Sequence, residues 1–99
     1  MMEDPRPELK YDSNAWARLL TMVEQDGDRT LLGILDGFRC LGLRLHRGRE
    51  GYVLRPEYDP KTSGWASEAR YMADRDRWLV PRQAELIHYL DRLTREATA

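Results

Sequence analysis

Six side chains suited to binding anions lie between positions 44 and 55 of this 99-residue chain. They are Arg44, His46, Arg47, Arg49, Tyr52 and Arg55. Arginine presents a planar fork of N–H donors that matches a carboxylate or a phosphate, and histidine and tyrosine add further hydrogen-bonding groups. These residue types therefore predict recognition of an acidic protein segment or of a nucleic-acid backbone.

The pattern around these residues predicts a helix followed by a hairpin. Apolar residues recur at helical spacing from Leu31 to Leu41, with Asp28 as a candidate N-cap. Gly42 suits the end of this helix, because glycine adopts positive φ without steric penalty. The period then changes to two on either side of a glycine-containing turn over 47–51, which predicts two short strands.

The predicted alternation divides the hairpin between two faces. On the first strand Leu43 and Leu45 lie opposite Arg44 and His46, and on the second Tyr52 and Leu54 lie opposite Val53 and Arg55. A two-stranded ribbon is marginal alone, so we expect its apolar side to pack on helices. Both of its long edges stay open unless covered, and an open edge accepts an extended peptide as an extra strand.

Helical patterns flank the hairpin on both sides. One predicted helix spans 14–25 and folds back on the next through a short linker, and a loop follows the hairpin over 57–64. A helix is expected over 65–77, although Asp74 or Asp76 could instead cap a short helix over 78–80. The last helix begins at Pro81, which suits a first helical turn.

These elements predict the fold class and the domain organisation. We expect a small α+β domain of order αα-ββ-αα, with a two-stranded antiparallel hairpin packed on helices. The N-terminal segment 1–10 is polar and carries two prolines, so it is expected to be disordered, and 11–97 form a single domain.

Two features of the helix before the hairpin have alternative interpretations. Gly33 and Gly37 share one face, which suggests close approach of a dimer mate, close packing of the preceding helix, or simple tolerance. Cys40 is expected to be a small buried hydrophobe. As the only cysteine it forms no internal disulfide, which fits a reducing compartment.

No arrangement of residues matches a catalytic or metal-binding motif. His46, His88 and the single cysteine do not supply paired zinc-ligand spacing. Glu85-x-x-His88 is half of a di-iron pattern, but no second copy occurs on another helix. The serines lack a nucleophile-elbow setting and the glycines lack a phosphate-binding motif. We therefore expect a protein that is not an enzyme, with no cofactor and no metal.

Composition places few limits on the partner. The formal net charge is −1, so gross charge predicts neither nucleic acid nor membrane as a partner. No apolar run approaches the roughly 20 residues needed to cross a bilayer. The charged N-terminus resembles neither a signal peptide nor a transit peptide, so we expect a cytoplasmic protein.

Short motifs in and after the hairpin resemble a known family. The segments 38–45 (FRCLGLRL) and 52–56 (YVLRP) look like the N-terminal docking domain of the tubulysin synthase type, and 83–90 (QAELIHYL) is similar to its helical ending. The resemblance covers 30–93 and implies an αββαα fold that can homodimerise. It also implies that the exposed hairpin receives a short, charged C-terminal tail of a partner, contacted by the six hairpin residues named above.

We therefore expect a free-standing, docking-like domain that binds a protein partner. The basic hairpin would bind an acidic or C-terminal segment, and the domain could form a homodimer. The alternative is a nucleic-acid-binding accessory protein that uses the same hairpin, which a steep fall of affinity with salt would reveal. A third interpretation is that the arginines are solvated charges that guard the strand edges.

Overall fold

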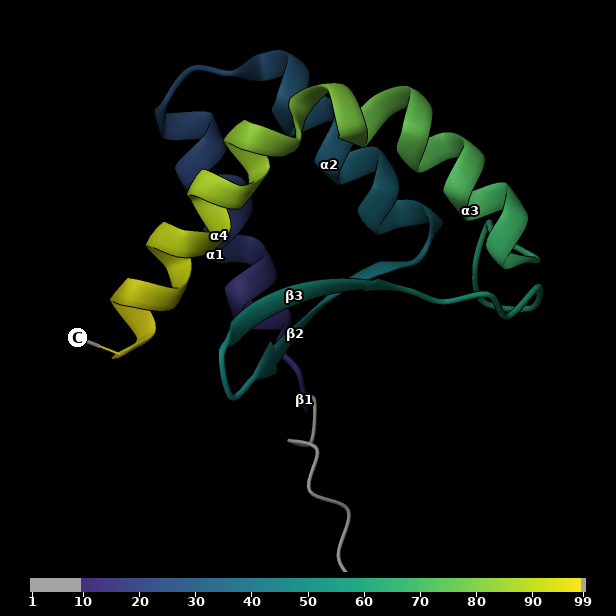
Figure 1. Cartoon of the computed structure of the whole chain (residues 1–99), viewed down its shortest axis with the longest axis horizontal. Coiled ribbons are helices and arrows are strands. Elements are labelled where there is room, and N and C mark those ends of the chain that lie inside the picture. The colour runs from purple at the N-terminus through teal and green to yellow at the C-terminus, as the bar shows by residue number, and fades with distance from the viewer. Residues whose placement is uncertain (1–9, 99) are drawn as a thin grey trace, which may run out of the picture.

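The computed structural model describes residues 10–98, and its fold is mixed α+β, which confirms the expected class (Figure 1). The elements in order are β1 (Lys10–Tyr11), α1 (Ser13–Gln25), α2 (Arg29–Leu41), β2 (Leu43–Gly48), β3 (Gly51–Pro56), α3 (Glu68–Asp74), the π turn η1 (Arg75–Leu79), the 3-10 turn η2 (Val80–Arg82) and α4 (Gln83–Thr98). The segment 1–10, predicted to be disordered, lies outside the described residues except for Lys10, which belongs to β1.

The sheet has three strands in the order β1-β2-β3, so the predicted two-stranded hairpin is incomplete. β1 pairs antiparallel with β2 and places Tyr11 opposite His46. The N–H of Asp12 extends this pairing by donating to the Leu45 carbonyl at 3.0 Å. The predicted αα-ββ-αα order is wrong at its start, because a two-residue strand precedes α1. So short a strand has no alternating pattern from which to predict it.

The hairpin itself forms as predicted. β2 and β3 are antiparallel with Gly48 opposite Gly51, so Arg49 and Glu50 form the turn. Gly51 has a φ of 135°, which favours glycine. Leu43 and Leu45 are buried, whereas the alternating Arg44 and His46 are half-buried on the other face.

The two helices before the hairpin fold back on each other through a tight turn. Asp12 Oδ1 accepts from the N–H of Ala15 at 2.9 Å, and Asp28 Oδ1 accepts from the N–H of Leu31 at 3.1 Å. These bonds satisfy free amides of the first helical turns. Gly42 ends α2 with a φ of 124° and directs the chain into β2, as the sequence predicted.

The region after the hairpin differs most from expectation. α3 begins at Glu68 and not at position 65, because Ser67 Oγ caps it by accepting from the N–H of Arg70 at 3.4 Å. The chain continues through η1 and η2 into α4, and Pro81 lies in the 3-10 turn. No side chain caps η2, and Asp74 instead accepts from Trp65 Nε1 at 2.8 Å, so the predicted capped helix over 78–80 is wrong.

The core lies where α1, α2 and α4 meet the helix-facing side of the hairpin, and the arch from α3 to α4 passes over β3 (Figure 1). Trp16 and Trp65 are the largest fully buried side chains. Trp16 Nε1 donates to the Leu43 carbonyl at 3.1 Å, which satisfies a buried indole N–H. No helix within residues 10–98 has both the length and the apolar character required to cross a bilayer.

Two expectations for α2 are corrected by its surroundings. Cys40 is exposed, so its predicted burial is wrong, because it lies beside the apolar stripe and not on it. A Cβ built on Gly33 or Gly37 meets nothing within 4 Å, so α1 does not pack closely against these glycines. They are exposed on the outer surface of α2.

Candidate functional site

The outer face of the sheet, opposite the buried Leu43 and Leu45, carries three of the six predicted hairpin residues: Arg44, His46 and Arg55. The term outer face denotes the side chains of Tyr11, Arg44, His46, Val53 and Arg55. Arg44 lies opposite Arg55, and His46 lies between Val53 and Tyr11. The structure therefore brings two arginines and a histidine together on one surface, as the alternation predicted.

Arg44 is held by its own chain. Its Nη1 donates to the carbonyls of Arg39 at 2.8 Å and Leu43 at 3.1 Å, and its Nη2 lies 3.6 Å from Glu57 Oε2. A cation at the carbonyl end of α2 is favourable because it complements the helix dipole. Arg44 therefore stabilises the junction between α2 and β2, and only part of its guanidinium faces solvent.

Tyr52 is also structural and lies on the helix-facing side of the hairpin. Its side chain is buried, its hydroxyl lies 3.4 Å from Asp12 Oδ2, and its backbone N–H donates to Thr94 Oγ1 of α4 at 3.3 Å. These contacts join the hairpin to the N-cap of α1 and to α4. Tyr52 therefore does not reach the outer face.

His46 is half-buried beside β1. The rings of Tyr11 and His46 lie 5.8 Å apart between centroids at an angle of 55°. The Nδ1 atom of His46 is buried and has no hydrogen-bond partner among residues 10–98. This histidine therefore packs against Tyr11 and offers little surface of its own.

Arg47, Arg49 and Arg55 remain exposed. Arg47 lies near the end of β2, Arg49 lies in the turn at the tip of the hairpin, and Arg55 lies near the end of β3. Within residues 10–98, none of the three forms an ion pair, in contrast to Arg44 with Glu57. These three arginines are the hairpin cations available to an incoming anion.

The two edges of the sheet differ. On the β2 side, the Leu45 carbonyl accepts from Asp12 and the Leu43 carbonyl accepts from Trp16, so β1 and the start of α1 cover this edge. On the β3 side, the N–H of Tyr52 points away from β2 and reaches α4. Because backbone direction repeats every second residue, the N–H and carbonyl of Leu54 also point away from β2.

Leu54 is the place where the β3 edge opens. No hydrogen bond from its N–H to another residue in 10–98 is found. Two residues further on, Pro56 has no N–H to offer. The open edge is therefore short, and the N–H of Leu54 is its one outward-facing donor without a partner among residues 10–98.

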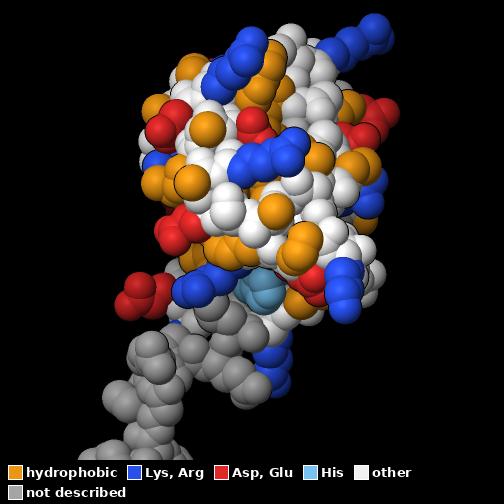
Figure 2. All heavy atoms as spheres, turned by 90° about the vertical axis from the view of Figure 1, so that its right-hand side faces the viewer, with side chains coloured by type: hydrophobic (Ala, Val, Ile, Leu, Met, Phe, Trp, Pro, Cys, Tyr) orange, Lys and Arg blue, Asp and Glu red, His pale blue; other side chains and the backbone are white. Residues whose placement is uncertain are grey.

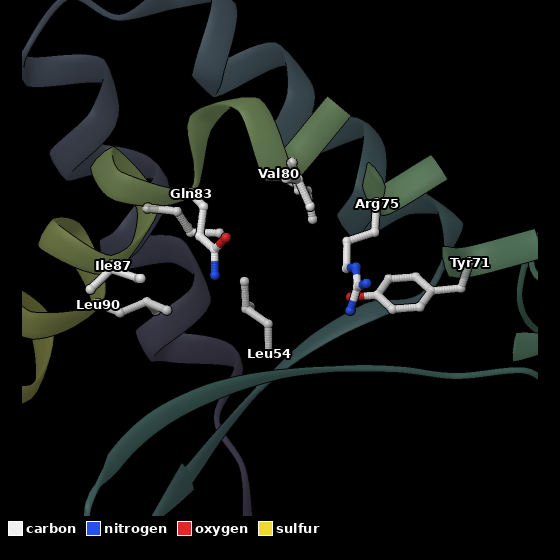
Figure 3. Close-up of a pocket in the computed structure, with 9 residues that line it drawn as sticks. Leu54, Tyr71, Arg75, Val80, Gln83, Ile87 and Leu90 are labelled. Carbon is white, nitrogen blue, oxygen red and sulfur yellow. The ribbon is translucent and has the colours of Figure 1, made fainter. Parts of the chain in front are cut away.

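A groove lies beside this open edge, enclosed by β3 and by the arch from α3 to α4. Its volume is about 340 Å³. It is lined by Leu54, Tyr71, Arg75, Leu79, Val80, Gln83, Leu86, Ile87 and Leu90, and we call it the Leu54 groove. Figure 3 shows Leu54 pointing into it from β3, Ile87 and Leu90 facing it from α4, and Arg75 beside Tyr71 at its other end.

The polar groups of the Leu54 groove are suited to an anion. Arg75, the Tyr71 hydroxyl and the Gln83 amide offer donors, and no carboxylate belongs to the residues that line the groove. Burial raises the pKa of Tyr71 above its usual value, although nearby Arg75 opposes this shift. The phenol therefore stays protonated at neutral pH and remains a hydrogen-bond donor.

The described part of the chain contains no cluster of side chains suited to a metal ion. Among residues 10–98, no three His, Cys, Asp or Glu side chains lie close enough together to hold a metal ion. His88 packs edge-on against Tyr89 on its own helix, with ring centroids 5.8 Å apart.

The Leu54 groove was missed by reasoning from the sequence. Val80 and Ile87 are large, apolar and exposed, and Ile87 lies beside the buried stripe of Leu86, Tyr89 and Leu93 on α4. An apolar residue outside the stripe was a detectable signal. The sequence does not show that Ile87 faces β3, because this position depends on the arch that contains Pro81.

Comparisons of the chain with protein-family models, with curated proteins and with solved structures gave no match. The resemblance to a docking-domain family therefore rests on its short motifs alone.

Proposed function

We propose that this protein is a non-enzymatic docking module that binds an extended, acidic segment of a partner protein along β3. The observation that carries the proposal is the difference between the two sheet edges. β1 covers the edge of β2, whereas the backbone groups of Leu54 remain open beside the exposed Arg55. An extended segment can add its backbone to such an edge, and its side chains supply specificity.

The expected pose follows from strand geometry. A segment paired with Leu54 places alternate side chains on the two sides of the sheet. Side chains on the outer face lie beside Arg55, where a glutamate or aspartate gains a charge-assisted hydrogen bond. Because the open edge is short, backbone pairing supplies few hydrogen bonds, and these side-chain contacts must contribute much of the affinity.

A defined peptide tests this proposal. We would label a capped peptide of alternating glutamate and valine and measure its binding by fluorescence anisotropy, beside a matched peptide with lysine in place of glutamate. We expect the acidic peptide to bind and Arg55→Glu to weaken it about tenfold or more, because the change replaces an attraction with a repulsion. Arg70→Glu, an exposed arginine on α3, is the control. Equal binding of both peptides would contradict the proposal.

Nucleic acid is the second candidate, favoured by the exposed Arg47, Arg49 and Arg55. Figure 2 shows positive, negative and hydrophobic side chains interspersed over the α3 end of the molecule, so a basic surface does not extend over that end. An oligonucleotide that binds with an affinity falling steeply with salt would favour this candidate. An affinity for the acidic peptide that survives nuclease treatment would favour docking.

We also propose a cytoplasmic location and a homodimer formed through α2. The single free cysteine, Cys40, is exposed, which suits a reducing compartment. Gly33 and Gly37 line a second hollow on α2 together with the exposed Trp78, and small residues allow two helices to approach closely. Analytical ultracentrifugation of wild type and Gly37→Glu tests the dimer.

A further inference from the structure

The Leu54 groove has apolar walls that the protein itself leaves partly uncovered. Ile87 is 54% exposed and Val80 is 45% exposed, and both line the groove together with the half-buried Leu54. Large apolar side chains gathered around a hollow, and not scattered singly, indicate a surface that another molecule covers. In Figure 3, side chains from β3, η2 and α4 face the same space.

The far end of the groove holds one guanidinium group, that of Arg75. The Nε and Nη2 atoms of Arg75 donate to Asp76 Oδ1 at 3.4 and 3.1 Å, which leaves its Nη1 outside this pair. Arg75 and the Tyr71 hydroxyl lie side by side at that end (Figure 3). With no carboxylate in the lining, this end complements a negative group on the occupant.

The position of the groove next to the open edge indicates the form of the occupant. Leu54 contributes both its backbone groups to the edge and its side chain to the groove. A segment paired with Leu54 therefore directs one side chain into the groove and the two adjacent side chains onto the outer face, one beside Val53 and the other beside Arg55. A lipid-like acid would fill the groove but would leave the Leu54 amide without a partner.

We propose that the Leu54 groove is an anchor subsite for one bulky apolar side chain of an otherwise acidic, extended protein segment. The anchor packs between Val80, Ile87 and Leu90, one acidic neighbour faces Arg55, and an acidic residue further along the segment meets Arg75. This inference rests on the proposed docking function and adds the specificity of the site, which is a bulky apolar residue flanked by acidic ones.

Two peptides and two matched variants test the anchor. One capped peptide alternates glutamate and apolar residues around a central leucine, and the other has asparagine in place of that leucine. We expect wild type to bind the leucine peptide about tenfold or more tightly than the asparagine peptide. Ile87→Glu removes this preference, and any general repulsion of the acidic peptides by the added carboxylate should appear equally in the matched His88→Glu variant. His88→Glu, at the adjacent exposed position, retains the preference.

Folding is checked by circular dichroism, and Val80→Glu serves as a second groove variant if Ile87→Glu unfolds. Equal affinity of wild type for the two peptides, with Arg55→Glu weakening both, would overturn the anchor and leave the docking function intact. Binding of neither peptide would overturn both. Binding of dodecanoate alone would assign the groove to a lipid-like acid, and a dimer lost in Ile87→Glu would assign it to a second copy; either result would overturn the proposal.

Discussion

The backbone N–H of Tyr52 donates to the Thr94 hydroxyl at 3.3 Å, and this bond marks the point at which α4 stops covering the edge of β3. One outward-facing residue further along the strand, Leu54 opens into the groove. Helix α4 therefore protects part of the edge and leaves a short gap. A single long open edge would promote aggregation, whereas a short gap beside a groove selects its occupant.

Thr94→Val should destabilise the protein by about 1 kcal/mol, because it leaves the Tyr52 N–H without its partner. Thr21→Val is the matched control. The Thr94 hydroxyl donates to the Leu90 carbonyl at 2.9 Å, and the Thr21 hydroxyl likewise donates to the carbonyl four residues earlier, that of Ala17, at 3.0 Å, but Thr21 lies exposed on α1. Urea denaturation at neutral pH measures both variants. Equal loss of stability in the two would contradict a specific role for the Tyr52–Thr94 bond.

Arg44 and Arg55 lie opposite each other but should respond differently to charge reversal. Arg44→Glu should cost about 1–2 kcal/mol of stability, because it breaks bonds to the carbonyl end of α2 and places an anion there. Arg55→Glu should leave stability within about 0.5 kcal/mol and act on partner binding alone. Thermal unfolding and peptide binding of both variants separate these effects. The reverse order of destabilisation would contradict the assignment.

The glycines of α2 and of the turn should respond in opposite directions to alanine. Gly33→Ala and Gly37→Ala should each stabilise the monomer by about 1 kcal/mol, because the added Cβ meets nothing within 4 Å in a helix. Gly51→Ala should destabilise, since its φ is 135° and its Cβ would lie 2.9 Å from Thr94 Oγ1. Urea denaturation reports all three. Loss of stability in both helix variants would indicate that a second copy packs against this face.

Tyr89 should make the stability fall at alkaline pH. Burial, and then its 2.7 Å hydrogen bond to Asp26, raise its pKa from 10.0 to about 12. A raised pKa in the folded state stabilises the protein below pH 10, and this contribution is lost between pH 10 and about pH 12. Unfolding measured at several pH values should show this loss in wild type and in Tyr58→Phe, and less of it in Tyr89→Phe. An unchanged alkaline fall in Tyr89→Phe would assign it to other groups.

The sequence predicted those parts of the fold whose signals are local. Asp28 and Gly42 bound α2 as their chemistry implied, and the alternation of Leu43, Arg44, Leu45 and His46 gave the correct faces of β2. Each of these depends on neighbours a few residues away. A reader of the sequence can therefore place the hairpin and its helices without the structure.

The parts that were missed depend on contacts between distant segments. β1 exists because Tyr11 meets His46, and a two-residue strand carries no pattern of its own. Arg44 and Tyr52 looked like surface contacts because the sequence does not show the Arg39 carbonyl or Asp12 beside them. The groove could not be predicted because the sequence does not show that Pro81 lies in a 3-10 turn. This turn belongs to the arch that brings Ile87 opposite Leu54.

The most direct test of the account is amide chemical-shift mapping of the ¹⁵N-labelled protein with the leucine-centred acidic peptide. We predict that the largest changes occur at Leu54, Arg55 and Ile87, with a further change at Arg75. Changes confined to the hairpin tip at Arg47 and Arg49, with Leu54 and Ile87 unaffected, would contradict docking at the β3 edge.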